Sequence, residues 1–535
     1  MVTEFLVMSH AQPTKILFNA SFVLPKEISQ PVQAIGIRDG RISDIFSELP
    51  EKEENQEWYD CAGGVVVPGI VDAHFHLRNL GHVQRQVALH GAEDVEDIAA
   101  RLYAYEQDNS GEWLLGRGWD QNLWSKQEFP RASALDTLDI DKPIYLTRVD
   151  GHAAWVNTKA LQAAGITETT EDPLGGLIVR DDQGQATGIL IDTAMELVQA
   201  VMPVPSDEEI WNDFKVACAR CVRLGISGVH DMGTAPQELA VLKKMEAAGE
   251  LPLRVTSYLY GEIDDLAPYL EQKVERQGLV RVVGVKLFVD GALGSWGAAF
   301  FEPYHDKPGE DGLILIAPED LDYACQKIQE AGYQIAIHAI GDRAVSMALD
   351  AIDKAQGEAQ ARHRVEHAQV IRPSDRERFI RLGAIASMQP CHAVSDMPWV
   401  GDRLGPERVE HAYTWQTLIK NGVPLALGSD APVESEDPWW GFYTAVNRQD
   451  LACQPDGGWH GHESLSAEQT LHGFTRGAAY ASGDEDLGEI RVGALADLTV
   501  VDRNPLDVKS QELREIRCLQ TWVNGHQVFQ RNDLS

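Results

Sequence analysis

Eight short apolar segments constrain the fold of this chain more than any other feature of its sequence. They are Val65–Val71, Ile226–Asp231, Leu253–Tyr260, Arg281–Val289, Gln334–Ile340, His363–Ala368, Ala384–Gln389 and Pro424–Ser429. From the second segment onward, the intervening stretches are mostly helix-patterned, as in Pro318–Ala331, where apolar residues recur on one helix face. Eight strands alternating with helices predict an α/β fold, a closed parallel (β/α)8 TIM barrel.

The interval between the first and second strands is far too long for one crossover helix. It contains about 155 residues, whereas a helical crossover needs little more than a dozen. We therefore predict a large insertion after strand 1, a subdomain at about 77–215, within a barrel domain at 67–487.

Both ends of the chain are typical of short strands joined by tight turns. Asp39-Gly40 and Asn524-Gly525 are hairpin signals between alternating segments. Neither end is long enough to bury a core alone, so we predict one small β-sandwich built from residues 1–66 and 488–535. The apolar patch Phe5-Leu6-Val7-Met8 is too short for a signal-peptide core. Met8 is an alternative start, which leaves open whether residues 1–7 are native.

Composition excludes several classes of partner. The formal charge of −36, from 46 basic and 82 acidic residues, disfavours nucleic acid and anionic membranes. Hydrophobic residues make up 44% of the chain without a membrane-length apolar run, which indicates a globular protein. Seven scattered cysteines fit reduced thiols and a cytoplasmic protein. Cys218 and Cys221 form a CxxC inside a helical stretch with no second pair nearby, which argues against a zinc site there.

Six side chains near the ends of the predicted strands are suited to binding metal. They are His74, His76, Lys286, His338, His367 and Asp430. Each has a simpler explanation alone, such as a core histidine or a helix cap. Active-site residues of such barrels gather at the carboxyl ends of the strands, and strand alternation points His74 and His76 to the same side. Together the six predict a site for divalent metal, with zinc as the expected ion. The second oxygen of Asp430 would serve as a catalytic base.

The segments around these residues resemble the amidohydrolase superfamily, specifically amidohydrolase family 3, the group containing N-substituted formamide deformylase. The resemblance covers almost the whole chain. The matching segments are Pro68–His76, Val285–Gly291, Ile337–Ala344, Arg364–His367, Gln389–Ala393, Gly428–Glu434 and Gly493–Leu498.

The resemblance implies a (β/α)8 barrel, a β-sandwich from both termini, and hydrolysis of a non-peptide C–N bond in a small molecule by a metal-bound hydroxide. The family's ligand pattern corresponds to the six residues given above without a gap. It also implies, together with a charge argument, that Lys286 is carboxylated, since an ammonium would repel the cations that a carbamate bridges. The number of bound metal ions, one or two, remains open. A homodimer is expected from the size and the family.

The predicted insertion carries two segments similar to pocket-lining parts of this family, Gly116–Trp124 and Asp150–Asn157. His152 is a candidate catalytic residue that polarises a carbonyl or holds a leaving group, or else a structural anchor of the insertion. His230 and Asp231 are expected to support the ligands. The candidate substrate-binding residues are Trp119, Trp155, His392 and Arg448. Arg448, like Arg343 and Arg364, has simple pairing with acidic residues as its alternative.

Other reactions fit the same residues. Ester or lactone hydrolysis would use the same metal site, as would a non-hydrolytic isomerase or decarboxylase. A non-catalytic binding module is disfavoured, because such proteins usually lose ligands and all six are present here.

Overall fold

A single eight-stranded sheet forms the centre of the computed structural model, which describes residues 14–28, 30–106, 112–272, 274, 278–355 and 361–532. Its neighbouring strands are paired in parallel. In sheet order they are β7 (Ile70–Phe75), β14 (Ile226–Thr234), β15 (Arg254–Leu259), β16 (Val280–Phe288), β17 (Gln334–Ala339), β18 (Arg364–His367), β19 (Ile385–Met388) and β20 (Leu425–Leu427). The predicted α/β TIM barrel is thereby confirmed.

The two outer strands of this sheet meet just beyond their carboxyl ends. Phe75 and Ala431 form a parallel bridge. On either side of it, Asp430 N donates to His74 O at 2.8 Å and His76 N donates to Ala431 O at 2.9 Å. The barrel therefore closes between two backbone segments that carry three of the predicted metal ligands.

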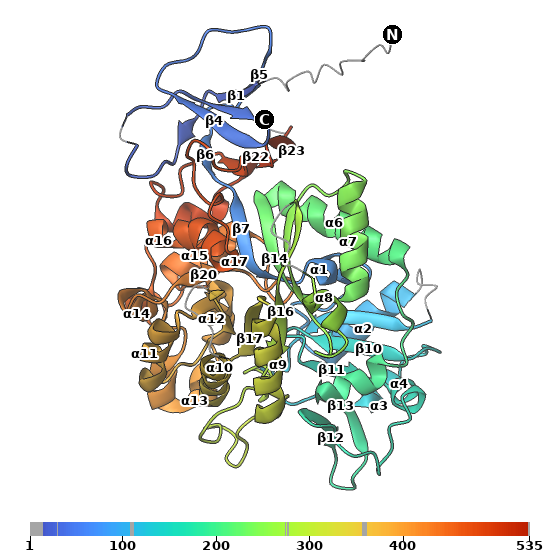
Figure 1. The fold of residues 1–535 in the computed structure, drawn as a ribbon. Coiled ribbons are helices and arrows are strands. Elements are labelled where there is room, and N and C mark those ends of the chain that lie inside the picture. The colour runs from blue at the N-terminus through green and yellow to red at the C-terminus, as the bar shows by residue number, and fades with distance from the viewer. Residues whose placement is uncertain are drawn as a thin grey trace.

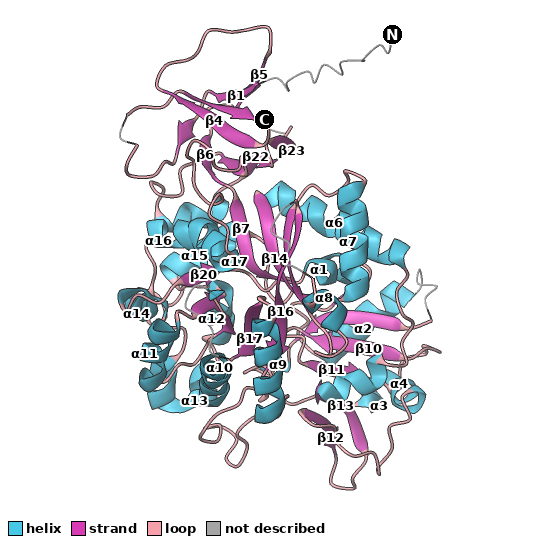
Figure 2. Cartoon of the chain, in the orientation of Figure 1, coloured by secondary structure: helices cyan, strands magenta, loops and turns pink. Residues whose placement is uncertain are grey.

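Helices cover the outside of the barrel (Figure 2). Those from the second strand onward are α7 (Pro236–Ala247), α8 (Ala267–Leu270), α9 (Pro318–Glu330), α10 (Asp342–Lys354), α11 (Pro373–Leu382), α12 (Pro390–Asp396), α13 (Val400–Arg408), α14 (Trp415–Lys420), α15 (Pro438–Asn447), α16 (Ala467–His472) and α17 (Ala478–Ser482). The helix predicted from Pro318 is confirmed as α9, and its buried residues are Leu321, Ala324, Cys325 and Ile328.

The first predicted strand is divided into two. The run Val65–Val71 was expected to form one barrel strand, but β6 (Val65–Pro68) belongs to another sheet and β7 begins at Ile70. Gly69 lies between them, where a Cβ atom would be 2.3 Å from Ser227 Oγ. Its N–H donates to Asp497 O at 2.8 Å. Glycine at this close approach lets the chain pass from one sheet into the other.

Strands from the two ends of the chain lie side by side at the top of Figure 1. One sheet has the order β4-β3-β1-β5, formed by β1 (Thr14–Phe18), β3 (Ala34–Arg38), β4 (Arg41–Phe46) and β5 (Gln56–Asp60). The other has the order β2-β6-β21-β22-β23, formed by β6 with β2 (Ser21–Phe22), β21 (Leu498–Val501), β22 (Cys518–Val523) and β23 (His526–Gln530). A shared apolar cluster containing Leu17, Ile35, Leu498 and Trp522 joins the two sheets. Both predicted hairpin turns are present, at Asp39-Gly40 and Asn524-Gly525.

Between β7 and β14 the chain forms a separate six-stranded sheet of order β12-β13-β11-β10-β9-β8. Its strands are β8 (Val87–Ala88), β9 (Leu114–Trp119), β10 (Ile144–Arg148), β11 (Ala153–Val156), β12 (Gly176–Arg180) and β13 (Ala186–Asp192). The helices of this interval are α1 (Leu77–Val83), α2 (Val95–Glu106), α3 (Ala132–Asp136), α4 (Thr158–Ala163), α5 (Glu196–Gln199) and α6 (Asp207–Leu224). This sheet occupies the lower right of Figure 1 and has an apolar cluster of its own.

All seven cysteines are unpaired thiols, and Cys218 and Cys221 are buried in α6. Within the described residues, none of the helices has the length and apolar character needed to cross a bilayer.

Candidate metal centre

A cavity of about 770 Å³ opens where the carboxyl ends of the barrel strands face the inserted sheet. Its lining includes His338, His367 and Asp430 from the barrel, and Arg117 and His152 from the insertion. Three of the six predicted ligands thus border open space, which is where a reacting molecule has access.

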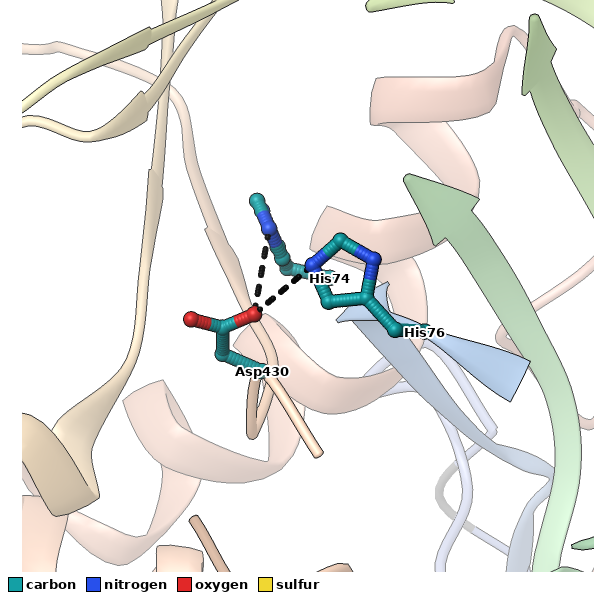
Figure 3. Close-up of side chains that lie close together, drawn as sticks. All are labelled: His74, His76 and Asp430. Atoms are coloured by element: carbon teal, nitrogen blue, oxygen red, sulfur yellow. Dashed lines mark ion pairs between the residues drawn. The ribbon is translucent and has the colours of Figure 1, made fainter. Parts of the chain in front are cut away.

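Three predicted ligands from the first and last strands converge on one another (Figure 3). The Nε2 atom of His76 is 3.1 Å from Asp430 Oδ1, and that of His74 is 3.5 Å from the same oxygen. His74 lies within β7 and His76 directly follows it. The predicted convergence of the two imidazoles is therefore confirmed.

The remaining three predicted ligands lie next to this group. Lys286 Nζ is 3.4 Å from His74 Nε2. The ring of His367 is 4.6 Å from that of His74 and 4.5 Å from that of His338, centroid to centroid. The structure therefore brings all six predicted ligands into one cluster.

A carboxylate that the sequence interpretation did not identify orients His74. The Nδ1 atom of His74 is 2.7 Å from Glu366 Oε2, and both side chains are fully buried. Arg364 donates to both oxygens of Glu366, at 2.7 and 3.0 Å, and contacts His230 Nδ1 at 2.8 Å. Of the two alternatives for Arg364, the structure therefore contains the pairing with an acidic residue. His230 supports this pair, as expected for a residue behind the ligands.

Burial controls the charge of the cluster. It lowers the pKa of His74, His338 and His367 well below the usual value, so these imidazoles are neutral. Burial also lowers the pKa of Lys286 to about 8, which increases the fraction of neutral amine. Neutral imidazole is the form of histidine that binds metal.

His392 lines the cavity as predicted, next to the proposed ligands. Gln369 Nε2 lies 3.1 Å from His392 Nδ1, and an amide nitrogen can only donate. The Nε2 atom of His392 lies 3.6 Å from Asp430 Oδ2 and makes no hydrogen bond among the described residues. The ring nitrogens of His367 and His392 and an oxygen of Asp430 lie close enough together to hold one ion, so His392 is a further candidate ligand.

His152 reaches the cavity from the inserted sheet. Its ring is 5.1 Å from that of His338, and its Nδ1 atom is 2.6 Å from Asp192 Oδ1. Burial alone lowers the pKa of His152, but the hydrogen bond and charge of Asp192 outweigh it and raise the pKa. The imidazole thus gains proton affinity beside a cluster of neutral histidines.

Three residues that were predicted to contact the substrate do not line this cavity. Trp119 and Trp155 pack against each other in the core of the inserted sheet, with ring centroids 6.3 Å apart. Arg448 is fully buried over the Trp415 ring and donates to the carbonyls of Tyr413 and Trp459. These positions correct the expectation that the three contact a substrate, because each side chain fills a core.

Sequence reasoning missed Glu366 and Gln389, the partners of two proposed ligands, and Asp192, the partner of His152. Gln389 Oε1 accepts from His367 Nδ1 at 2.8 Å. Both Glu366 and Gln389 stand inside segments that carried the family resemblance. The available signal was therefore their position at the ends of β18 and β19, next to recognised ligands.

The donor set fits a divalent transition metal. The Nδ1 atoms of His74 and His367 are engaged by acceptors, which leaves both Nε2 atoms unprotonated and able to bind an ion. The buried Nε2 atom of His338 makes no hydrogen bond among the described residues, and Asp290 Oδ1 lies 3.5 Å from it. Neutral imidazoles with one carboxylate are ligands of zinc-like ions.

Comparisons with known proteins agree with this chemistry. Residues 57–529 match the sequence model of the amidohydrolase family. The protein YtcJ of Bacillus subtilis (strain 168) is 32% identical over 530 residues, which cover 97% of this chain and 100% of YtcJ. N-substituted formamide deformylase of Arthrobacter pascens is 27% identical over 540 residues, which cover 93% of this chain and 95% of that protein. The crystal structure of an uncharacterized metal-dependent hydrolase from Pyrococcus horikoshii OT3 is similar with a TM-score of 0.76 at 30% identity, covering 93% of this chain and 99% of that one.

Proposed function

This chain belongs to the amidohydrolase family, and from that premise we propose that it is a metal-dependent hydrolase that cleaves an amide-type C–N bond of a small molecule. The bond type is supported by the similarity to N-substituted formamide deformylase, a protein whose name specifies such a bond. The metal is supported by the similarity to the Pyrococcus horikoshii hydrolase.

One observation carries the proposal: neutral imidazoles, a buried lysine and a carboxylate from separate barrel strands meet at the border of a large cavity. The proposed ligands are His74, His76, Lys286, His338, His367 and Asp430. When bound, a divalent ion supplies Lewis-acid activation of water and of the substrate carbonyl.

Lys286 is proposed to bind metal as a carbamate. Carbamate formation requires the neutral amine, and burial lowers the pKa of Lys286 to about 8. Its Nζ lies 3.4 Å from His74 Nε2, and Phe288 packs against it at 4.6 Å. An amine in this position adjoins the other ligands, and carboxylation would make it an anionic one.

Asp430 is the proposed proton carrier. A carboxylate that binds metal through one oxygen keeps the other for a proton, which Asp430 would take from the attacking water and deliver to the leaving nitrogen. His152, oriented by Asp192, supplies a donor at the cavity wall, where negative charge develops on a carbonyl oxygen.

The first experiment measures metal content per chain, without added metal, in wild type, Lys286→Ala and Lys327→Ala. Lys327 lies on α9 and is absent from the cavity lining, so it serves as the matched control. We expect about two zinc-like ions in wild type and in the control, as in two-metal hydrolases, and one or fewer in Lys286→Ala. One ion in all three proteins would remove the bridging role of Lys286. No metal in any of them would refute the metal centre.

The second experiment identifies the reaction with a panel of N-formyl and N-acyl amines in ¹⁸O-labelled water. Hydrolysis incorporates the label into the acid product, whereas an isomerase or decarboxylase leaves the acyl group unlabelled. Matched esters and lactones in the same panel separate C–N from C–O bond cleavage. Faster cleavage of the esters in every pair would argue against the proposed bond type.

A further inference from the structure

Two of the arginines that line the cavity are neutralised by carboxylates. Arg148 contacts Asp150 Oδ2 at 2.5 Å, pairs with Asp120, and donates through Nε to Gln121. Arg220 Nε lies 2.6 Å from Glu436 Oε1. These pairs leave neither arginine with an unmatched charge.

Arg117 differs from both. It lies on β9, beside Thr147 of β10, and lines the same cavity. Among the described residues, its side chain makes one hydrogen bond, from Nη2 to the carbonyl of Val149 at 3.3 Å. Its Nε–H is buried and has no partner, and no carboxylate in the described part of the chain forms an ion pair with it.

Such a group is costly to maintain without a ligand. A guanidinium stays charged at physiological pH, and removing it from water without an anion carries an electrostatic penalty. Its planar fork of donors matches the two oxygens of a carboxylate. An anion entering the cavity would therefore be stabilised by Arg117.

The location connects this charge with the proposed metal centre. A Cβ atom at Gly151 would lie only 3.4 Å from Nη2 of Arg117, so the guanidinium packs against the turn that carries His152. The His152 ring is in turn 5.1 Å from that of His338. One molecule can thus extend from the metal ligands to Arg117.

We propose that Arg117 binds a carboxylate carried by the substrate, so that the natural substrate is an amide bearing one negative charge, such as an N-acyl or N-formyl amino acid. This inference rests on the proposed function, because it names the substrate class of the same cavity. Much of the remaining charged lining is acidic, including Asp396 and Glu434, and Arg117 is its one unpaired arginine among the described residues. A single negative charge held at Arg117 therefore fits this cavity better than a dianion does.

The test compares N-formylphenylalanine with N-formylphenylalaninamide, which are nearly equal in size and differ by one charge. Calorimetry measures the affinity of each for wild type, Arg117→Gln, Arg117→Lys and Arg343→Gln. Arg343, paired with Asp311 outside the cavity lining, is the control. Where turnover occurs, kcat/KM is measured for both compounds.

We expect Arg117→Gln to weaken binding of the carboxylate about 10- to 100-fold, and to change binding of the amide little. Arg117→Lys keeps the charge and should retain part of the preference, whereas Arg343→Gln should behave as wild type. The inference is overturned if wild type does not prefer the carboxylate, if neither compound binds, or if Arg117→Gln weakens both equally. Binding without turnover would leave the inference standing and count against the proposed reaction, so the two fail separately.

Discussion

The Nδ1 atom of His74 lies 2.7 Å from Oε2 of Glu366, with both side chains fully buried. Because a carboxylate only accepts, the ring proton is on Nδ1 and the Nε2 lone pair faces Asp430 and Lys286. Glu366 therefore selects the tautomer of His74 that can bind a metal, and Arg364 holds Glu366 in place.

Glu366→Gln should weaken metal binding. The amide can still accept from His74, but it lacks the charge that raises the basicity of the imidazole. Loss of such a partner typically costs about 10- to 100-fold in metal affinity, which competition with a chelator measures. The control is Glu463→Gln, because Glu463 is also a buried carboxylate and accepts a hydrogen bond from Thr417 N. Equal affinity in the two variants would contradict the role of Glu366.

Removal of the metal should lower the thermal midpoint of unfolding. An ion that binds only the folded protein stabilises it by about 4 kcal/mol when present at 1,000 times its Kd. Differential scanning fluorimetry on chelator-stripped and zinc-restored protein measures the change. Lys286→Ala should show a smaller shift, because a ligand is lost. An unchanged midpoint on stripping would show that the ion does not contribute to stability.

His363 should make stability depend on pH. Its Nδ1 accepts from the Ile335 N–H at 3.0 Å, and burial lowers its pKa from 6.5 to about 4. The unfolded chain therefore binds more protons between these values, so the stabilisation is complete above pH 6.5 and is lost as the pH falls toward 4. The free energy of unfolding, obtained from urea unfolding at a series of pH values, is compared for wild type and His363→Gln. Its slope against pH should differ between the two proteins by up to about 1.4 kcal/mol per pH unit. Parallel curves would exclude this linkage.

Gly81→Ala should destabilise the contact between α1 and α6. A Cβ atom at Gly81 would lie 1.9 Å from the carbonyl oxygen of Asp213, so the helices must separate. Overpacking of this kind costs about 1–3 kcal/mol, seen as a lower thermal midpoint. Gly401→Ala on α13 meets no atom within 4 Å and should be neutral or stabilising, because alanine favours helix. A similar effect of both substitutions would argue against the steric explanation.

The barrel could be predicted because its elements follow local patterns. The segment Gln334–Ile340 became β17 almost to the residue, and the helix at Pro318 became α9. The division of Val65–Val71 could not be predicted in this way. It depends on Ser227 and Asp497, which are far from Gly69 in the sequence and adjacent to it only after folding.

The same distinction applies to the candidate site. The six proposed ligands could be located because parallel strands bring their carboxyl ends together. Glu366 could not be linked to His74, because the two residues are 292 positions apart in the sequence. The neighbouring His367 also departs from strand geometry, with a φ of 68°, so strand alternation does not predict where the side chains here point. Trp119 and Trp155 were misassigned because their sequence pattern does not reveal which side of the inserted sheet faces the cavity.

The closure of the barrel next to Phe75 and Ala431 has a consequence for the lifetime of the folded protein. The backbone bonds of His74 and His76 that join the first strand to the last lie beside the side chains of those residues and of Asp430. Opening the barrel at this edge must therefore pull the proposed ligands apart. An ion bound there would raise the barrier to escape from the native state, so release of the metal would set the rate at which the barrel opens.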